Sequence, residues 1–422
     1  MQLDLKVRDG YKQTEVGYIP KDWAVKKLIE IVEKVGDGLH RTPDYIDSSE
    51  YYFINGNNLI NGTIQINSNT KCVSYEEYLK HRKELKQNAI LISINGTIGN
   101  IAVYKGENIV LGKSAAYINC KDEDFGFLYH LLQSPLTLNY FESALTGSTI
   151  RNLSLKAIRN TPIPFPPQNE KLLIASILFT WDKGIEKLQQ LIAAKLKLKK
   201  ALMQQLLTGN KRFKELTEGW QEVALGDIFS RITRKNSESN SNVLTISAQR
   251  GLINQEHYFN KQVASETLDN YFLLKSGEFA YNKSYSKGYP MGAIKRLKYY
   301  KAGVVTTLYI CFGLKDSSKH SPEYMEQYFN AGFLNRGLKK IAQEGGRAHG
   351  LLNVAPSDFF NLKLSVPRLE EQTRIASVLQ AADKEIEILQ QKLNALKQQK
   401  KGLMQKLLTG QVRVNLTAEP VS

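Results

Sequence analysis

The sequence has 422 residues and a formal net charge of +16, from 57 Lys and Arg against 41 Asp and Glu, and at roughly 100–200 residues per domain this length predicts two to four folding units. Its 42% of hydrophobic residues can build buried cores, which excludes wholesale disorder. No apolar run approaches the roughly 20 residues of a membrane span. The first residues lack the apolar core of a secretory leader. Three widely spaced cysteines exclude a disulfide framework and a zinc ribbon, so we expect a cytoplasmic protein that has no membrane partner and whose positive charge favours a polyanionic one.

The first segment, residues 1–165, mixes short β-type runs with Gly and Asn turns. The runs at 89–94 and 101–104 predict strands of a mixed α/β domain. The stretch 106–114 looks like a phosphate-binding loop, but five residues separate its glycines where that motif has four, and we predict a strand at a sheet edge. The charged residues 84–86 resemble half of a metal-dependent nuclease site, but no Asp partner is evident, and we interpret them as solvated charge on a helix.

Residues 166–212 predict the first long helix. Pro166 and Pro167 precede its apolar pattern and Gly209 ends it. Apolar residues recur at the alternating four- and three-residue spacing of a heptad repeat, which specifies a coiled-coil contact. The predicted seam of this helix comprises Ile174, Leu178, Trp181, Ile185, Leu188 and Ile192.

The second segment, residues 213–366, again contains β-type runs, at 243–247 and 304–312. It opens as the first segment does, because Trp220, Leu225 and Ile228 match Trp23, Leu28 and Ile31. The middles of the two segments do not align. We therefore expect a second mixed domain that shares its ends with the first and differs in its loops.

Residues 367–412 predict a second long helix, followed by a tail at 413–422. The predicted seam of this helix comprises Ile375, Leu379, Ile386, Leu389, Leu393 and Leu396. Residues 166–209 and 367–410 align without a gap at an offset of 201, and 23 of these 44 positions are identical. The chain is therefore a tandem duplication of one large unit.

Each helix would be about 58 Å long, from about 39 residues at 1.5 Å each, and each presents a seam that needs a partner. We predict that the two helices pair with each other, and halves related by a two-fold axis would make the pair antiparallel. The expected fold class is α+β, with two mixed α/β domains joined by two long helices that form an antiparallel coiled coil with internal pseudo-two-fold symmetry. The alternative is two unrelated amphipathic helices, each packed on its own domain.

Several turns in both mixed segments combine basic, polar and aromatic side chains, the groups that hold phosphates and contact base edges. The candidate DNA-binding residues of the first segment are His40, Arg41, Thr42, Asn57, Asn95, Thr97, Ser148 and Arg151. Those of the second segment are Arg231, Arg234, Lys235, Arg250, Asn282, Lys283, Tyr285, Lys287, Arg347 and His349. The alternative for each turn is an ordinary surface loop. Lysines on the two helices, such as Lys199 and Lys400, either follow a phosphate backbone or form a solvated or partner-docking face.

Motifs for catalysis are absent from the sequence. The six histidines show no metal-ligand spacing, and neither a glycine-rich dinucleotide fingerprint nor a base-methylation motif occurs. We therefore predict no catalytic residue, no metal site and no cofactor bound by this chain.

The ends of the helical repeats carry a resemblance to a known family. The repeats begin in IPFPPQNEKLLIASIL (163–178) and LSVPRLEEQTRIASVL (364–379) and finish in LMQQLLTG and LMQKLLTG. With DGLHRTPDY and GTIGN in the first segment, and FAYNKSYSKGYPMGAI and EGGRAHG in the second, the whole chain resembles the DNA specificity subunit of type I restriction-modification systems. One departure is Lys171, where the family usually has the glutamine that the second repeat keeps as Gln372.

The resemblance implies a non-catalytic subunit with target-recognition domains at 1–165 and 213–366, each of which recognises one half of a bipartite, gapped DNA site. It implies that double-stranded DNA, two methyltransferase subunits and, optionally, two motor-nuclease subunits are the partners. S-adenosylmethionine, ATP and Mg would be bound by those partner subunits.

Two functions from other classes remain as alternatives: a stand-alone DNA-modifying enzyme with an unseen active site, and a non-specific DNA-bridging coiled-coil protein. Methyl transfer by the purified chain alone would favour the first. Equal affinity for specific and random duplexes at physiological salt would favour the second, because binding through phosphates alone shows little sequence preference.

Overall fold

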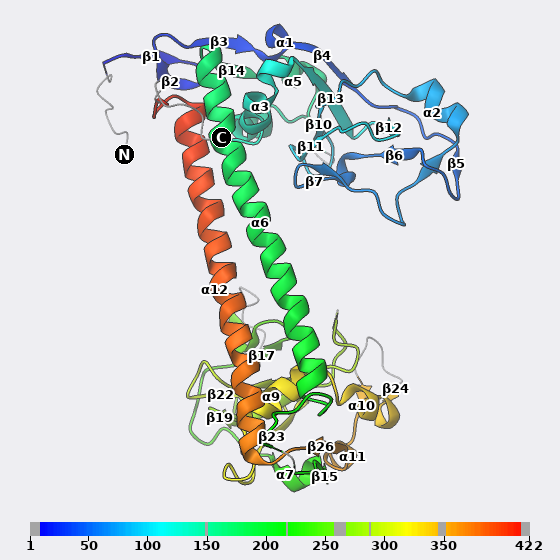
Figure 1. Cartoon of the computed structure of the whole chain (residues 1–422), viewed down its shortest axis with the longest axis vertical. Coiled ribbons are helices and arrows are strands. Elements are labelled where there is room, and N and C mark those ends of the chain that lie inside the picture. The colour runs from blue at the N-terminus through cyan, green and yellow to red at the C-terminus, as the bar shows by residue number, and fades with distance from the viewer. Residues whose placement is uncertain are drawn as a thin grey trace. The chain divides into compact units, whose positions relative to one another are not determined.

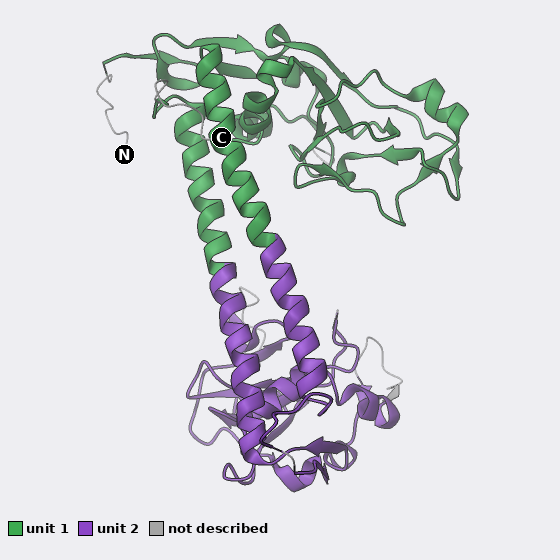
Figure 2. Ribbon diagram, viewed as in Figure 1, with its two compact units in different colours: residues 1–189, 391–422 green, residues 190–390 purple. Residues whose placement is uncertain are grey.

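The computed structural model describes residues 9–147, 151–216, 218–256, 267–286, 288–344 and 352–414. The chain divides into two compact units, which are residues 1–189 with 391–422 (the first unit) and residues 190–390 (the second unit), as Figure 2 shows. Each unit contains one mixed α/β segment and about half of each of two long helices. Among the described residues, no helix is long and apolar enough to cross a membrane.

The two long helices are α6 (Gln168–Leu206) and α12 (Leu369–Leu408), of 39 and 40 residues (Figure 1). Prolines just before each helix favour its start, because their fixed φ is already helical. Gly209 and Gly410 follow the last turns with φ of 74° and 69°. This left-handed conformation strains residues that carry a Cβ, which explains why a glycine closes the turn after each helix.

The first unit is built around two four-stranded sheets. Its strands are β1 (Tyr11–Thr14), β2 (Gly17–Pro20), β3 (Ala24–Lys27), β4 (Val32–Asp37), β5 (Tyr45–Ile46), β6 (Tyr52–Ile54), β7 (Leu59–Ile60), β8 (Thr63–Ile64), β9 (Cys72–Val73), β10 (Ile90–Ser93), β11 (Ile101–Val103), β12 (Ile109–Leu111), β13 (Ala115–Cys120) and β14 (Pro162–Phe165). Its shorter helices are α1 (Leu28–Ile31), η1 (Gly56–Asn58), α2 (Tyr75–His81), α3 (Asp122–Leu131), α4 (Pro135–Ser143) and α5 (Leu155–Arg159). One sheet has the order β11-β10-β13-β4 and is antiparallel, and the other has the order β12-β6-β9-β5 with β12 parallel to β6. The pairs β1–β2, β3–β14 and β7–β8 complete the unit.

The main core of the first unit includes both long helices. Ile174 and Leu178 of α6 share one buried cluster with Met404 and Leu407 of α12, together with residues of β10, β13 and α3. The beginning of α6 therefore lies beside the end of α12 within this unit. Burying each of these side chains stabilises the fold by about 1.5–3 kcal/mol relative to exposure.

The second unit has its own sheets and core. Its strands are β15 (Gln221–Ala224), β16 (Phe229–Ile232), β17 (Leu244–Ser247), β18 (Gly251–Asn254), β19 (Phe272–Lys275), β20 (Phe279–Asn282), β21 (Ala293–Arg296), β22 (Ala302–Val305), β23 (Ile310–Leu314), β24 (Gln343–Glu344), β25 (Leu352–Asn353) and β26 (Lys363–Val366), and its shorter helices are α7 (Leu225–Ile228), α9 (Pro322–Asn330), α10 (Asn335–Ile341) and α11 (Pro356–Phe360). The main sheet has the order β16-β23-β20-β21. Leu206 of α6 and Leu207, which follows it, share a buried cluster with Ile375 and Leu379 of α12, so here the end of α6 lies beside the beginning of α12.

Burial along the long helices follows the predicted heptad phase. The buried seam residues are Ile174, Leu178, Leu188, Ile192, Ile375, Leu379 and Leu393, and the half-buried ones are Trp181, Ile185, Ile386, Leu389 and Leu396. Leucines off the seam, such as Leu191 and Leu198, are exposed. These two leucines therefore face solvent, whereas the seam residues are buried or half-buried.

Three local predictions can be compared with the observed elements. The stretch 106–114 contains β12 at the edge of its sheet, as predicted. The run at 304–312 is not one strand, because a turn closed by the Tyr309 amide and the Thr306 carbonyl at 3.2 Å separates β22 from β23. The charged residues 84–86 lie in a loop after α2, so their assignment to a helix was wrong. Glu84 pairs there with Lys34 at 3.5 Å, and Lys86 pairs with Glu33.

Candidate nucleic-acid interface

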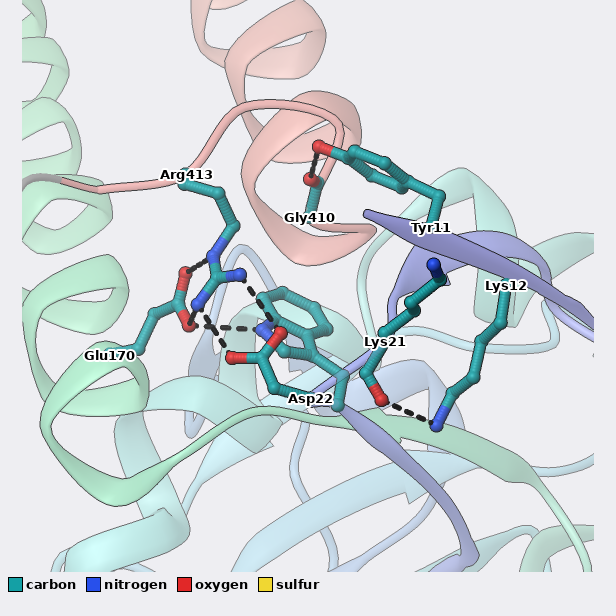
Figure 3. A network of polar contacts seen from close by, with 8 residues as sticks. Tyr11, Lys12, Lys21, Asp22, Glu170, Gly410 and Arg413 are labelled. Atoms are coloured by element: carbon teal, nitrogen blue, oxygen red, sulfur yellow. Dashed lines mark hydrogen bonds and ion pairs between the residues drawn. The ribbon is translucent and has the colours of Figure 1, made fainter. Parts of the chain in front are cut away.

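A buried carboxylate stands at the beginning of each long helix. In the first unit, Glu170 is 1% exposed and accepts two hydrogen bonds from the guanidinium of Arg413, at 2.6 and 2.8 Å. It also accepts a hydrogen bond from the indole N–H of Trp23 at 2.9 Å. Asp22 binds the other side of the guanidinium through two contacts of 2.9 Å (Figure 3). Hydrogen bonding to Arg413 lowers the pKa of Asp22 below its ordinary value.

The second unit repeats this junction with its own residues. Glu371 accepts hydrogen bonds from Arg212 at 3.0 and 2.7 Å and from the Trp220 indole at 3.3 Å. Glu371 and Arg212 lie 201 positions from Glu170 and Arg413, which is the offset of the sequence repeat. Sequence reasoning noted both tryptophans and both glutamates but missed the two arginines, although the offset alone could have found them.

A further pair of ion contacts links the long helices at equivalent positions. Lys400 lies 2.5 Å from Asp182 in the first unit, and Lys199 lies 2.5 Å from Asp383 in the second. Lys195 pairs with Glu385 at 2.6 Å. These lysines interrupt the apolar seam in the sequence, and the structure gives them acidic partners on the other helix. They are therefore interhelical contacts rather than a free basic face.

The two units differ beside these ion pairs. Gln327 donates a hydrogen bond to Asp383 at 2.8 Å in the second unit. In the first unit His130 takes this place, with its Nδ1 3.7 Å from Asp182. The ring is fully buried and neither of its nitrogens has a hydrogen-bond partner among the described residues. Burial, with Lys400 nearby, lowers the pKa of His130 to about 3, so the ring is neutral in the folded protein.

The departure at Lys171 also has a structural explanation. In the second unit, Gln372 accepts a hydrogen bond from the Ser321 amide at 2.9 Å and donates one to the Pro367 carbonyl at 2.8 Å. In the first unit the buried Lys171 instead forms an ion pair with the buried Asp124. A charged pair thus replaces a neutral amide contact at the start of α6.

Two predicted DNA-binding residues of the first unit line a common hollow. His40 and Asn95 face it together with Asp37, Lys113 and Asn152, in a volume of about 420 Å³. The strand-like bridge between Asn95 and Asn152 joins two of the loops that form its wall. His40 contacts Asp37 at 2.6 Å. Lys113 and Asn152 were not predicted, although Asn152 belongs to one of the loops singled out in the sequence.

The other predicted residues of the first unit lie around this hollow or apart from it. Arg41 contacts His81 at 2.6 Å and Glu77 at 3.5 Å, so its guanidinium already has partners. Arg151 forms an exposed ion pair with Glu142. Thr42 and Thr97 are exposed, and Asn57 lies in a second hollow, between the β6–β7 connection and the β8–β9 connection. Ser148 lies outside the described residues.

Some of the predicted DNA-binding residues of the second unit have hydrogen-bond partners within the fold, and others are exposed to solvent. Arg234 binds both oxygens of Glu278, at 3.1 and 2.8 Å, which fixes it within the fold. Lys235 donates to the Asn270 carbonyl at 2.7 Å. Arg231, Arg250 and Tyr285 are exposed, Asn282 is half-buried, and Lys287, Arg347 and His349 lie outside the described residues.

Lys283 lies close to Arg231, and burial together with the positive charge of Arg231 lowers the pKa of Lys283. Two neighbouring cations repel each other, and an approaching phosphate would relieve that repulsion.

A hollow of about 210 Å³ in the same unit is lined by Tyr289 and Asn330. Lys295, which was not predicted, donates to Asn330 at 2.7 Å and lies 5.2 Å from the Tyr289 ring.

No metal-binding cluster accompanies these groups in the described part of the chain. There, no cluster of three or more His, Cys, Asp or Glu could hold a metal ion. The two units thus present polar and basic loops, each carried by a similar helix junction and each with its own loop chemistry.

Comparison with known proteins identifies the family. The sequence profile of the family described as "Type I restriction modification DNA specificity domain" matches residues 20–197 and 217–398. The putative type I restriction enzyme MjaX specificity subunit of Methanocaldococcus jannaschii is 28% identical over 449 residues, which cover 98% of this chain and 99% of the relative. The type I restriction enzyme MjaVIII specificity subunit of the same organism is 24% identical over 438 residues, 96% of each chain.

A solved structure shows the same fold. The crystal structure of a type I restriction-modification system S subunit from M. genitalium has a TM-score of 0.55 and 17% sequence identity, covering 96% of this chain and 99% of the other. The two profile matches span most of the sequence, and each includes most of one long helix. The chain therefore belongs to the type I restriction-modification DNA specificity family, as its repeats predicted.

Proposed function

We propose that this chain is the sequence-specific DNA-binding subunit of a type I restriction-modification complex and that it recognises a bipartite, gapped DNA site. One observation carries this proposal: the two units share equivalent helix junctions but have different sets of polar loops. Equivalent junctions, Glu170 with Arg413 and Glu371 with Arg212, support a duplicated frame. Different loops on that frame imply two different half-sites.

The frame itself is proposed to be an antiparallel coiled coil with pseudo-two-fold symmetry. Two observations support it: each unit pairs the beginning of one long helix with the end of the other, and burial follows the heptad seam. The target-recognition domains would be residues 1–165 and 213–366, separated by helices at 166–212 and 367–412. Half-sites about one helical turn of DNA apart, about 34 Å, could then be contacted from one face of the duplex.

Within this function the chain carries out no chemistry. Two methyltransferase subunits would dock on the two halves of the frame, optionally with two motor-nuclease subunits. S-adenosylmethionine, ATP and Mg would be bound by those partners, in the cytoplasm. Basic and polar residues of the loops, such as the exposed Arg231 and the half-buried Lys283 and Asn95, would contact phosphates and base edges.

Mapping methylated bases in a host that carries this chain with its methyltransferase tests the proposal. We expect one asymmetric motif of two specific parts separated by an unspecific gap. A continuous motif, or none, would contradict the proposal. Methyl transfer by the purified chain alone would instead support the enzyme alternative. An affinity for random duplexes equal to that for the motif, at physiological salt, would support the bridging alternative.

A further inference from the structure

A second hollow in the first unit is lined mainly by residues with side-chain amides. It lies between the β6–β7 connection and the β8–β9 connection and has a volume of about 260 Å³. Six of its eleven lining residues carry side-chain amides, and among these described residues one is basic and none is acidic. We call it the amide hollow. Such a lining suits a neutral ligand that both donates and accepts hydrogen bonds.

Three of the asparagines hold the walls of the amide hollow in place. Asn58 accepts a hydrogen bond from the Asn55 amide at 3.0 Å and donates one to the Gln65 carbonyl at 3.1 Å. Asn55 accepts one from the Ser114 hydroxyl at 2.8 Å. The Asn67 side chain accepts one from the Asn69 amide at 2.9 Å. These side chains thus fix both connections relative to each other and to the loop at Ser114.

Two other asparagines have no such role. Asn57 and Asn69 are exposed, and neither side chain has a hydrogen-bond partner among the described residues. One comes from each of the two fixed connections. The connections that carry them are fixed by the hydrogen bonds of the other three asparagines, and the amides of Asn57 and Asn69 are available to a ligand in the hollow.

The remaining lining supplies an aromatic face and one cation. The Tyr45 ring is 41% exposed and packs edge-on against Phe53, with 5.6 Å between ring centroids. The Lys71 ammonium lies 5.9 Å from the Tyr45 ring. A cation at the rim of an uncharged, amide-lined surface is the arrangement expected where a phosphate is held beside a base edge.

We propose that the amide hollow recognises the edge of an adenine in an A·T pair, with Asn57 and Asn69 as the specificity-determining residues and Lys71 on a neighbouring phosphate. An asparagine amide matches adenine because its N–H donates to N7 while its oxygen accepts from the N6 amino group. Guanine presents two acceptors at the corresponding positions and is better matched by arginine or lysine. This inference rests on the proposed function and names the base class that one half-site contains.

The test uses the full-length chain, expressed with the methyltransferase of the same system, and a plasmid library in which each position of the mapped motif is randomised. Methylation is compared for the wild type, for Asn57→Ala with Asn69→Ala, and for Asn69→Asp. Asn139→Ala is the matched control, because Asn139 is exposed on α4 and lies outside the hollow. Thermal unfolding of each purified chain verifies folding.

We expect the double variant to lose about 10- to 100-fold of its preference for adenine at one position of one half-site, while the other half-site stays intact. Asn69→Asp should move that preference toward cytosine, whose amino group donates to a carboxylate; a structural role alone would not change the preferred base. Asn139→Ala should behave as the wild type.

Three outcomes would overturn the inference. An unchanged motif in a folded double variant would remove the amide hollow from recognition while leaving the proposed function standing. Uniform weakening at all positions would mean that the hollow contributes to binding without selecting a base. A wild type without a bipartite motif would contradict the proposed function and this inference together.

Discussion

Glu170 and Glu371 are carboxylates that the fold buries at the beginning of each long helix. A buried carboxylate is stable only when it is paired and hydrogen-bonded. Arg413 and Arg212 supply the charge, and a tryptophan indole supplies the remaining donor. Each arginine follows the end of the opposite long helix, so the contact ties one helix start to the other helix end.

Replacement of Arg413 tests this arrangement. Arg413→Met should lower the free energy of unfolding by about 1–3 kcal/mol, because Glu170 is left buried without its counter-charge. Urea denaturation at neutral pH measures the change. Arg151→Met is the matched control, since its ion pair with Glu142 is exposed and is worth roughly 0–1 kcal/mol. Equal losses in the two variants would contradict a special role for the buried junction.

His130 makes the stability of the first unit depend on pH. Its folded pKa of about 3 lies below the ordinary value of 6.5, so the unfolded chain binds a proton that the folded chain does not. The free energy of unfolding should therefore fall as the pH drops from 6.5 toward 3, by up to about 1.4 kcal/mol per pH unit from this group.

The second unit supplies the matched substitution for that experiment. In the second unit, Gln327 lies beside Asp383. The variant His130→Gln gives Asp182 in the first unit a glutamine neighbour of the same kind. Unlike histidine, this glutamine cannot be protonated. We expect the variant to lose less stability than the wild type between pH 7 and pH 5, as measured by urea denaturation at each pH. The same loss in both proteins would show that other groups cause the acid sensitivity.

Lys283 is a predicted DNA-binding residue of the second unit whose positive charge lies near that of Arg231. Lys283→Ala should weaken binding of the motif duplex by about 1–3 kcal/mol and relax one base position if the lysine contacts a base. If it contacts a phosphate, the affinity should fall for all sequences and the salt slope should decrease by about 1. Titrations at several salt concentrations distinguish these cases. Lys319→Ala, an exposed lysine paired with Asp316, serves as the control, and an unchanged affinity for Lys283→Ala would exclude the contact.

At the scale of elements, the apolar seam of each long helix is interrupted by lysines. Lys400–Asp182 and Lys199–Asp383 occupy equivalent positions of the repeat. A partly buried ion pair contributes little net stability, but a wrong register would bury an unpaired charge. These pairs therefore favour one register of α6 against α12, as a buried polar residue does in coiled coils.

The proposed spacer can be lengthened at the element scale. Inserting seven residues into both helices, between Gln189 and Gln190 and between Gln390 and Gln391, keeps the heptad phase and leaves both helix junctions intact. Seven residues add about 10 Å, so the unspecific gap should grow by about two to three base pairs of DNA. Methylome mapping reads the gap. An unaltered gap with unchanged half-sites would contradict the proposal that the helix length sets the distance between the half-sites.

At the scale of the molecule, two units with separate cores carry different loops on equivalent junctions. The pairing of β15 with β26 closes the second mixed segment, from Gln221 opposite Val366 to Ala224 opposite Lys363. Both of its ends therefore lie together next to the helix junction. A segment with such adjacent ends can be exchanged without displacing the helices.

This geometry defines a domain-exchange experiment. Replacing residues 213–366 with the corresponding segment of another specificity subunit should change one half-site and leave the other intact, provided that the donor keeps a tryptophan at the position of Trp220 for Glu371. Methylome mapping of the chimera and of its parents gives the result. Changes in both half-sites would mean that the two domains do not recognise DNA independently.

The sequence alone determined the presence of two long helices, the duplication and the family, although the helices at Gln168–Leu206 and Leu369–Leu408 are shorter than the predicted segments 166–212 and 367–412. These features depend on local periodicity, on prolines and glycines at helix ends, and on a repeat without gaps, all of which can be followed along one dimension. Heptad positions such as Leu178 and Leu379 are buried in the structure, because side chains three and four residues apart share one face of a helix.

Only the tertiary structure decided which polar groups remain available. Arg234 and Asn57 look alike in the sequence as loop residues suited to DNA, yet Arg234 is bound to Glu278 while Asn57 has no side-chain partner among the described residues. Arg413 finds Glu170 across 243 positions of sequence. Such pairings result from the packing of distant segments, where many small free energies add up, and no local pattern encodes them.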